Sequence, residues 1–173
     1  MSLTIDFSTL SLVDALDLAS LIEDEARERY EEFADQMELH HTDEAARFFR
    51  AMAINETKHG TELAERRNRL FPTTPRTVTR EMLWDVEAPE FDEARAFMSA
   101  REAMQVAMAA EVKAHDFFAA ALPHVSDPDV KALFEELRDE EIEHQTMVSQ
   151  AMAKLPIDRD IDPDDYADEP VSQ

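Results

Sequence analysis

Apolar residues recur along most of the chain at steps of three and four, the spacing that places them on one face of an α-helix. Four long helices are predicted in this way, over about residues 12–39, 43–70, 92–122 and 128–155. Ser11 and Thr42 stand at the N-cap positions of the first two, and Asp127 followed by Pro128 marks the start of the fourth. The chain is therefore predicted to be all-α.

The lengths of the connections predict how these helices are arranged. Two connections are short, so helices one and two, and helices three and four, should each form an antiparallel hairpin. Residues 72–91 contain three prolines and no long periodic run, and they form one long crossover with a short helix around residues 81–84. The predicted domain is a four-helix bundle over residues 1–156. Residues 157–173 hold seven acidic residues and little apolar content, which predicts a disordered tail.

Composition excludes several classes of function. There are 40 Asp and Glu against 17 Lys and Arg, a net charge of −23, so nucleic acid and anionic membranes are not expected as partners. There is no cysteine for a disulfide, a thiolate metal site or a nucleophile, and the single Gly60 cannot form a phosphate-binding loop. Neither a signal segment nor a membrane-spanning stretch is evident, so we expect a cytoplasmic protein.

Near its middle, the apolar stripe of each predicted helix contains a glutamate. These four residues are Glu23, Glu56, Glu111 and Glu141. In helices two and four, a histidine follows the glutamate by three positions, giving His59 and His144. Residues three apart share a helix face, so a Glu-x-x-His pair can direct one oxygen and one nitrogen at the same metal ion. A third pair, Glu38 and His41, lies at a helix end without a counterpart and is interpreted as a chance match.

Electrostatics favours metal at these positions. Four carboxylates inside an apolar bundle would repel one another, and burial would raise their pKa values further. Two divalent cations would neutralise them, and a set rich in oxygen with two imidazoles suits iron, with manganese as the other candidate. The alternative is a solvated charged face, but turning the helices to expose it would also expose the flanking Leu, Met and Phe residues. The predicted metal ligands are Glu23, Glu56, His59, Glu111, Glu141 and His144.

This pattern resembles the ferritin-like di-iron carboxylate proteins, and rubrerythrin and its relatives most closely, over about residues 11–155. Residues 23–30 (EDEARERY) look like the family's first-helix motif, and residues 139–144 (DEEIEH) like its fourth-helix motif. The resemblance implies that the lone glutamates of helices one and three are terminal ligands. It implies that the glutamates of the two Glu-x-x-His pairs bridge the metals, and that each histidine binds one metal.

Two features depart from the rubrerythrin pattern. Ala114 stands where rubrerythrins usually carry a further carboxylate, so the set is closer to the four glutamates and two histidines of bacterioferritins. The absence of cysteine means that there is no rubredoxin-like iron centre, so electrons would come from a separate donor protein.

The resemblance implies a di-iron oxidoreductase, a peroxidase or ferroxidase that oxidises bound Fe(II) with peroxide or dioxygen, and a homodimer or higher homo-oligomer. One alternative is an iron storage protein of the ferritin type, although no fifth short helix is evident. The other is a metal-free acidic interaction module, which the intact ligand set speaks against.

Four further residues have less certain roles in the predicted site. Tyr30 either serves the site, by a hydrogen bond to a ligand carboxylate or by electron donation, or is a core aromatic residue. His115 is either an extra ligand or a partly buried histidine. Asp139 could orient a ligand histidine by accepting a hydrogen bond from its other ring nitrogen. Gly60 inside a helix indicates a close helix contact or a local bulge.

Overall fold

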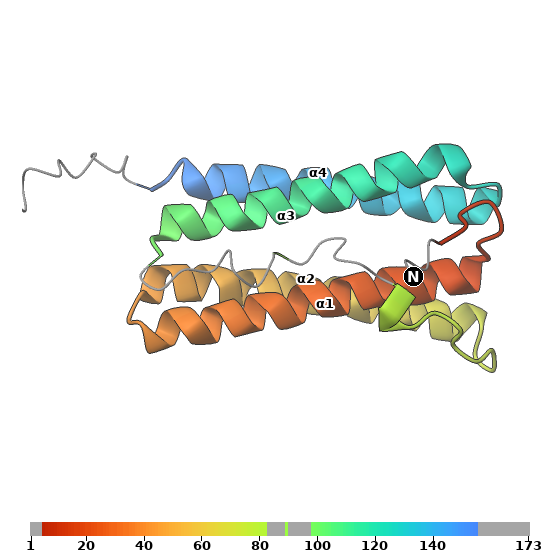
Figure 1. Ribbon diagram of the computed structural model, residues 1–173, viewed down its shortest axis with the longest axis horizontal. Coiled ribbons are helices and arrows are strands. Elements are labelled where there is room, and N and C mark those ends of the chain that lie inside the picture. The colour runs from red at the N-terminus through yellow and green to blue at the C-terminus, as the bar shows by residue number, and fades with distance from the viewer. Residues whose placement is uncertain (1–4, 83–88, 90–97, 156–173) are drawn as a thin grey trace, which may run out of the picture.

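The computed structural model describes residues 5–82, 89 and 98–155, and this part of the chain forms helices without any strand. The elements are α1 (Leu12–Leu39), α2 (Asp43–Leu70), the 3-10 helix η1 (Arg80–Met82), α3 (Ala100–Ala121), the 3-10 helix η2 (Leu122–His124) and α4 (Pro128–Met152). Figure 1 shows α1 with α2, and α3 with α4, as two hairpins lying along a common long axis. The predicted all-α bundle of two hairpins is confirmed.

Side chains cap three of the long helices. Ser11 accepts a hydrogen bond from the backbone N–H of Asp14, and Asp127 accepts from two N–H groups in the first turn of α4. Thr42 occupies the N-cap position of α2 but forms no such bond, because its hydroxyl donates instead to the carbonyl of Met37 at 3.0 Å. That bond closes the turn between α1 and α2.

The third and fourth helices are shorter than predicted where they can be compared. Ser99 is the N-cap of α3 and forms a capping box with Glu102. The prediction that Met98 and Ser99 are helical is therefore wrong. At the other end, α4 stops at Met152, and the N–H of Leu155 bonds to the carbonyl of Met152 in a tighter turn. Residues 92–97, the 83–84 part of the predicted short helix and the predicted tail lie outside the described residues.

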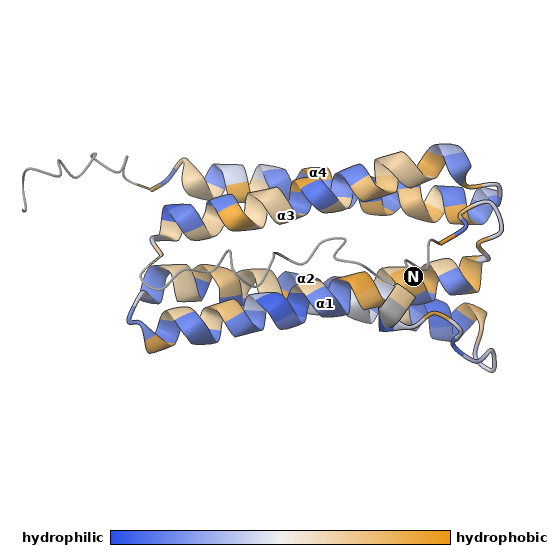
Figure 2. Ribbon diagram, in the orientation of Figure 1, coloured by the Kyte–Doolittle hydropathy of each residue, from blue (hydrophilic) through white to orange (hydrophobic). Residues whose placement is uncertain are grey.

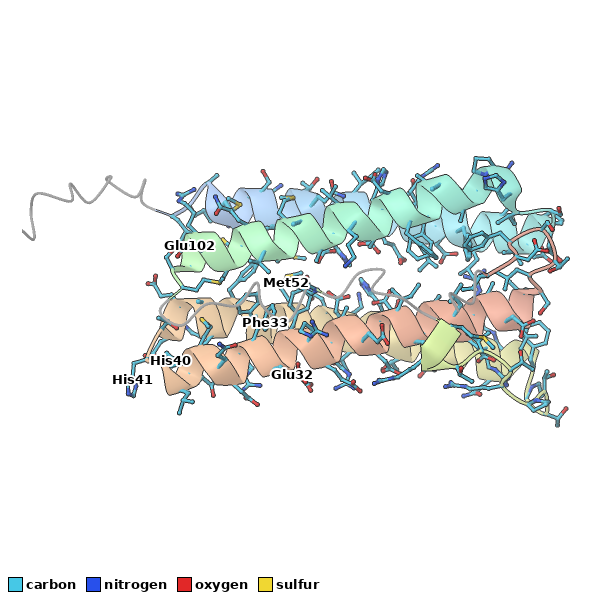
Figure 3. The ribbon with its side chains drawn as sticks, in the orientation of Figure 1. Glu32, Phe33, His40, His41, Met52 and Glu102 are labelled. Carbon is cyan, nitrogen blue, oxygen red and sulfur yellow. The ribbon has the colours of Figure 1, made fainter. Side chains whose placement is uncertain are left out.

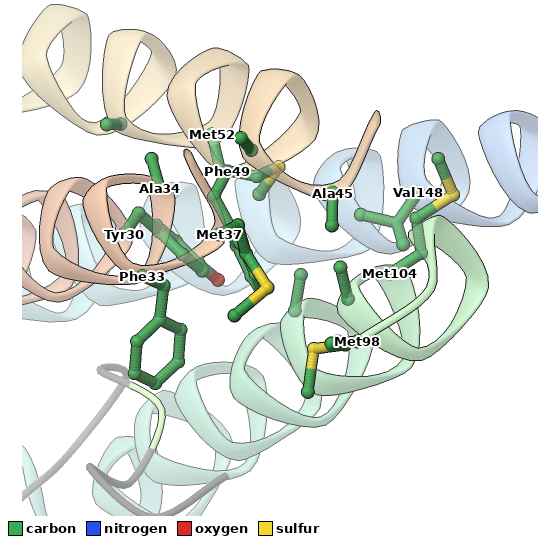
Figure 4. Packing of buried hydrophobic residues seen from close by; sticks show 14 of the residues in the cluster. Tyr30, Phe33, Ala34, Met37, Ala45, Phe49, Met52, Met98, Met104 and Val148 are labelled. Atoms are coloured by element: carbon green, nitrogen blue, oxygen red, sulfur yellow. The ribbon is translucent and has the colours of Figure 1, made fainter. Parts of the chain in front are cut away.

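The core consists of two apolar clusters. One contains Tyr30, Phe33 and Phe49, with ring centroids of Phe33 and Phe49 5.3 Å apart, and Figure 4 shows Met37 and Met52 beside them. The other contains Leu16, Leu133, Phe118 and Phe134. On every helix the residues of one cluster precede a buried glutamate and those of the other follow it. A polar layer therefore separates the two halves of the core.

Small residues form the buried face of α3. Ala103, Ala107, Ala110, Ala114 and Ala121 are buried there. Met104, Glu111 and Phe118 are buried on the same face, whereas Met108, His115 and Leu122 at its edge are only partly buried. The alanines let α3 lie close to its neighbours. Figure 2 shows that each long helix presents both polar and apolar residues around its circumference.

A buried ion pair joins the first hairpin to the start of the crossover. Asp17 on α1 and Arg67 on α2 are both buried, and two nitrogen–oxygen contacts of 2.9 and 3.3 Å join them. Arg67 also donates to the carbonyls of Phe71 and Thr74, and Arg76 lies 3.3 Å from Asp17. One guanidinium thus fixes two helices and the chain that leaves them.

None of the helices in the described ranges combines the length and the apolar character that crossing a membrane requires.

The Asp17→Ala variant should lose about 3 kcal/mol or more in the free energy of unfolding, measured by urea denaturation, because Arg67 would keep a buried charge without its carboxylate. Asp35→Ala is the matched control, since it removes an exposed partner of Arg50 and should cost less than about 1 kcal/mol. Equal losses in the two variants would contradict a central role for the buried pair.

Candidate metal centre

The structure brings all six predicted ligands together at the middle of the bundle. Glu23 comes from α1, Glu56 and His59 from α2, Glu111 from α3, and Glu141 and His144 from α4. All are buried except His59, whose side chain is 15% exposed. They lie where the two apolar clusters meet, because each occupies the middle of the inward stripe of its helix.

The two imidazoles, one from α2 and one from α4, contact each other. The rings of His59 and His144 are stacked, with centroids 4.7 Å apart and planes inclined by 7°. His144 Nδ1 lies 2.9 Å from Glu111 Oε2 and 3.5 Å from Glu141 Oε2. His59 Nδ1 lies 4.0 Å from Glu23 Oε2. Each Glu-x-x-His pair therefore faces a glutamate of the helix that completes its hairpin.

Two sets of donor atoms are close enough to hold a metal ion. Glu56, His59 and His144 form one set, and Glu111, Glu141 and His144 form the other, with the donor atoms of each set within 4.8 Å of one another. His144 belongs to both. The two sets adjoin through His144 and draw on α2, α3 and α4, and Glu23 belongs to neither. They are candidate positions for two neighbouring ions.

Several of these donor atoms lack any partner among the described residues. Glu23 Oε2, both carboxylate oxygens of Glu56, His59 Nδ1 and Glu141 Oε2 are buried and form no hydrogen bond. Leaving a buried polar atom unsatisfied costs about 1–3 kcal/mol, and more when it is charged. Carboxylate oxygens and imidazole nitrogens fit iron or manganese, whereas structural zinc sites are closed tetrahedra. The residues therefore fit a pair of divalent ions.

Burial and mutual repulsion change the protonation of the carboxylates. Burial raises the pKa of Glu23 well above its ordinary value, and Glu56 adds to the effect. Burial, with the charge of Glu111, raises the pKa of Glu56 to about 7 and that of Glu141 to about 8. In the absence of metal the site therefore holds protons near neutral pH, and a metal ion would replace them.

The histidines move in opposite directions. Burial alone would lower the pKa of His144, but its hydrogen bond to Glu111 and its close approach to the Glu141 carboxylate outweigh burial and raise the pKa to about 11. Burial lowers the pKa of His59, and the neighbouring His144 lowers it further. His144 thus carries a positive charge among the carboxylates, where a metal ion would otherwise stand.

Tyr30 satisfies both of its predicted interpretations. It is fully buried in the apolar cluster, stacked on Phe49 with centroids 6.0 Å apart, and Figure 4 shows it among the core side chains. Its hydroxyl also donates to Glu111 Oε1 at 3.0 Å. Because Glu111 accepts from Tyr30 on one oxygen and lies against His144 on the other, its carboxylate is held in place from two sides.

Two weaker candidates lie away from the centre. Ala114 takes the buried position on α3, and His115 turns outward, with Nδ1 3.0 Å from Asp116 Oδ1. Asp139 is exposed and pairs with Arg138 at 2.7 Å, so the role of orienting a histidine is not supported. Figure 3 also shows His40 and His41 at the end of the first hairpin, away from the middle of the bundle.

Gly60 lies where α2 comes close to α1. A Cβ atom added there would meet the Cβ of Glu23 at 3.5 Å, an ordinary van der Waals contact. The helix continues through this position without a bulge. The structure therefore supports neither predicted reason for the glycine, because an alanine would fit at this helix contact and the helix has no bulge.

The fold and the donor set are those of a ferritin-like bundle with a candidate carboxylate–histidine metal centre. The family model for rubrerythrin matches residues 14–167, so the chain belongs to the rubrerythrin family. The crystal structure of an uncharacterized conserved protein from Magnetospirillum magnetotacticum MS-1 is similar, with 31% sequence identity and a TM-score of 0.65. That match covers 87% of this chain and 99% of the other. A search of curated proteins found no match. Family and donor set together support a di-iron protein in general.

The metal-free protein should become less stable as pH rises from about 5 to 8. In the folded state Glu56 and Glu141 keep protons to about pH 7 and 8, and His144 to about 11, whereas unfolded glutamate and histidine lose theirs near 4.5 and 6.5. The folded state then binds more protons, so the free energy of unfolding falls with pH, and the lowered pKa of His59 opposes this only in part.

Urea denaturation in the presence of a chelator at several pH values measures this slope. Glu141→Gln should make the decline shallower, because the amide does not titrate. Stability that increases across this range would contradict the protonation states assigned to the site.

Proposed function

We propose that this protein is a di-iron oxidoreductase that oxidises bound Fe(II) with peroxide or dioxygen. The observation that supports it is the set of buried donor atoms without hydrogen-bond partners, which α1, α2 and α4 contribute to one polar layer. A purely structural polar layer would be expected to satisfy its own hydrogen bonds. On this proposal, cations would take the place of the missing hydrogen-bond partners.

The proposed ligand roles follow the resemblance to the family rather than the two donor sets. Glu56 and Glu141 would be shared between the two ions, and Glu23 and Glu111 would each serve one. His59 and His144 would each bind one ion. When bound, two iron ions supply one-electron redox chemistry, each passing between the ferrous and ferric states.

The residues of the chain hold this centre and control its surroundings. The two apolar clusters exclude bulk water from both ends of the polar layer. Tyr30 fixes the orientation of Glu111 by its hydrogen bond. His144 Nδ1 lies against Glu111 in the metal-free protein, so metal binding would have to release the proton that His144 holds there. On the same proposal the protein is a homodimer and receives electrons from a separate donor protein, since the chain has no cysteine for a second iron centre.

Stopped-flow oxidation of the anaerobically loaded protein tests the activity. Hydrogen peroxide should oxidise two bound Fe(II) per molecule, consuming two protons and yielding two Fe(III) and two waters. The reaction should outpace that of free Fe(II) in the same buffer by about a hundredfold or more, because the ions are held together in one site. The absorbance of ferric iron reports the rate, and air replaces peroxide in a parallel experiment.

Bound iron that stays ferrous with both oxidants, or oxidises no faster than free Fe(II), would contradict the proposal. Retention of many ferric ions per chain after excess iron would instead favour storage.

A further inference from the structure

A pocket of about 60 Å³ opens between α2 and α4 directly outside the candidate centre. His59 forms part of its wall, together with Glu62 and Arg66 from α2 and Glu136 and Glu140 from α4. The pocket therefore connects the surface of the α2–α4 face with a predicted metal ligand.

His59 is the residue that links the pocket to the centre. It is the least buried of the six predicted ligands, and it is the one whose side chain lines this pocket. Its Nδ1 atom is buried without a hydrogen-bond partner, 4.0 Å from Glu23 Oε2. A ligand atom of His59 also lies within 4.8 Å of those of Glu56, which is buried with both oxygens unpartnered. The same imidazole thus borders the pocket and the unsatisfied donor atoms behind it.

The charges along the pocket favour a cation. Glu62, Glu136 and Glu140 contribute three carboxylates against the one guanidinium of Arg66, which pairs with Glu136 at 2.8 Å across the mouth. An excess of negative charge in a recess concentrates cations and repels anions. Glu140 is partly buried on the α4 side of the pocket.

The size of the pocket restricts what passes through it. Its volume of about 60 Å³ admits only a few water molecules. A divalent ion can exchange part of its water shell there for the carboxylate oxygens that both helices supply.

We propose that this pocket is the route by which Fe(II) reaches the centre, with Glu62 and Glu140 accepting the ion and His59 receiving it at the inner end. This inference rests on the proposed function, because it requires that the centre binds divalent metal. Arg66 opposes the passage of the cation by its charge and by its ion pair with Glu136.

The rate of metal uptake tests the route, with Co(II) as the spectroscopic probe mixed with the metal-free protein in a stopped-flow instrument. Glu62→Gln and Glu140→Gln should slow uptake about threefold or more at low ionic strength, and Arg66→Gln should accelerate it. The amount of Co(II) bound at the end should equal that of the parent. Raising the salt concentration should reduce these differences, because it screens charges at the mouth.

Glu65→Gln and Glu135→Gln are the matched controls. They make the same change in charge on the same two helices, at exposed positions that do not line the pocket. Both should load at the rate of the parent. If the controls slow uptake as much as the pocket variants, or if the pocket variants load at the parental rate, the route is wrong while the centre stands. If the parent binds no Co(II), the proposed metal centre itself is overturned, and the route with it.

Discussion

Four carboxylates and two imidazoles buried at one level of an apolar bundle impose a requirement for positive charge that the surrounding residues meet only in part. His144 supplies one charge and Tyr30 one hydrogen bond, and both act on Glu111. Glu23, Glu56 and Glu141 keep unpartnered oxygens and raised pKa values. Such an arrangement is costly for a metal-free protein, and two divalent ions would remove the cost. The rest of the structure can be understood as the framework that holds these groups at one level.

That framework is a pair of hairpins, each of which supplies three of the six donors. Two apolar clusters above and below the polar layer hold the helices in register, so that side chains far apart in the sequence face one another. The Asp17–Arg67 pair fixes the first hairpin and the start of the crossover through a single guanidinium. Rigid elements on both sides of the layer keep the donors close when no metal opposes their repulsion.

Much of this could be predicted from the sequence because the strongest signals are periodic. Glu56 with His59, and Glu141 with His144, are spaced so that each pair shares a helix face, and the apolar residues around them show which face is buried. Helix ends were predicted well where a cap or a proline marks them, as at Ser11 and Pro128. The two short connections, one within each hairpin, predict the antiparallel pairing of α1 with α2 and of α3 with α4.

The features that the sequence does not predict have physical reasons. The buried Asp17–Arg67 pair is not predicted, because the spacing of apolar residues gives no signal for a buried ion pair and the two residues are fifty positions apart. On α3 many adjacent positions are alanine, so the spacing of apolar residues does not show whether Ala114 or His115 faces the core. The pocket outside His59 depends on how α2 and α4 come together, which no local pattern records.

The most direct test of the account is the iron retained per chain after aerobic titration with Fe(II) and desalting. The parent should keep about two iron ions, and Glu56→Ala clearly fewer, because both of its unpartnered oxygens lie in the centre. Glu38→Ala breaks the remaining Glu-x-x-His pair, at the exposed end of α1, and should keep as many as the parent. A parent protein that retains neither iron nor manganese, or equal losses in the two variants, would contradict the central claim.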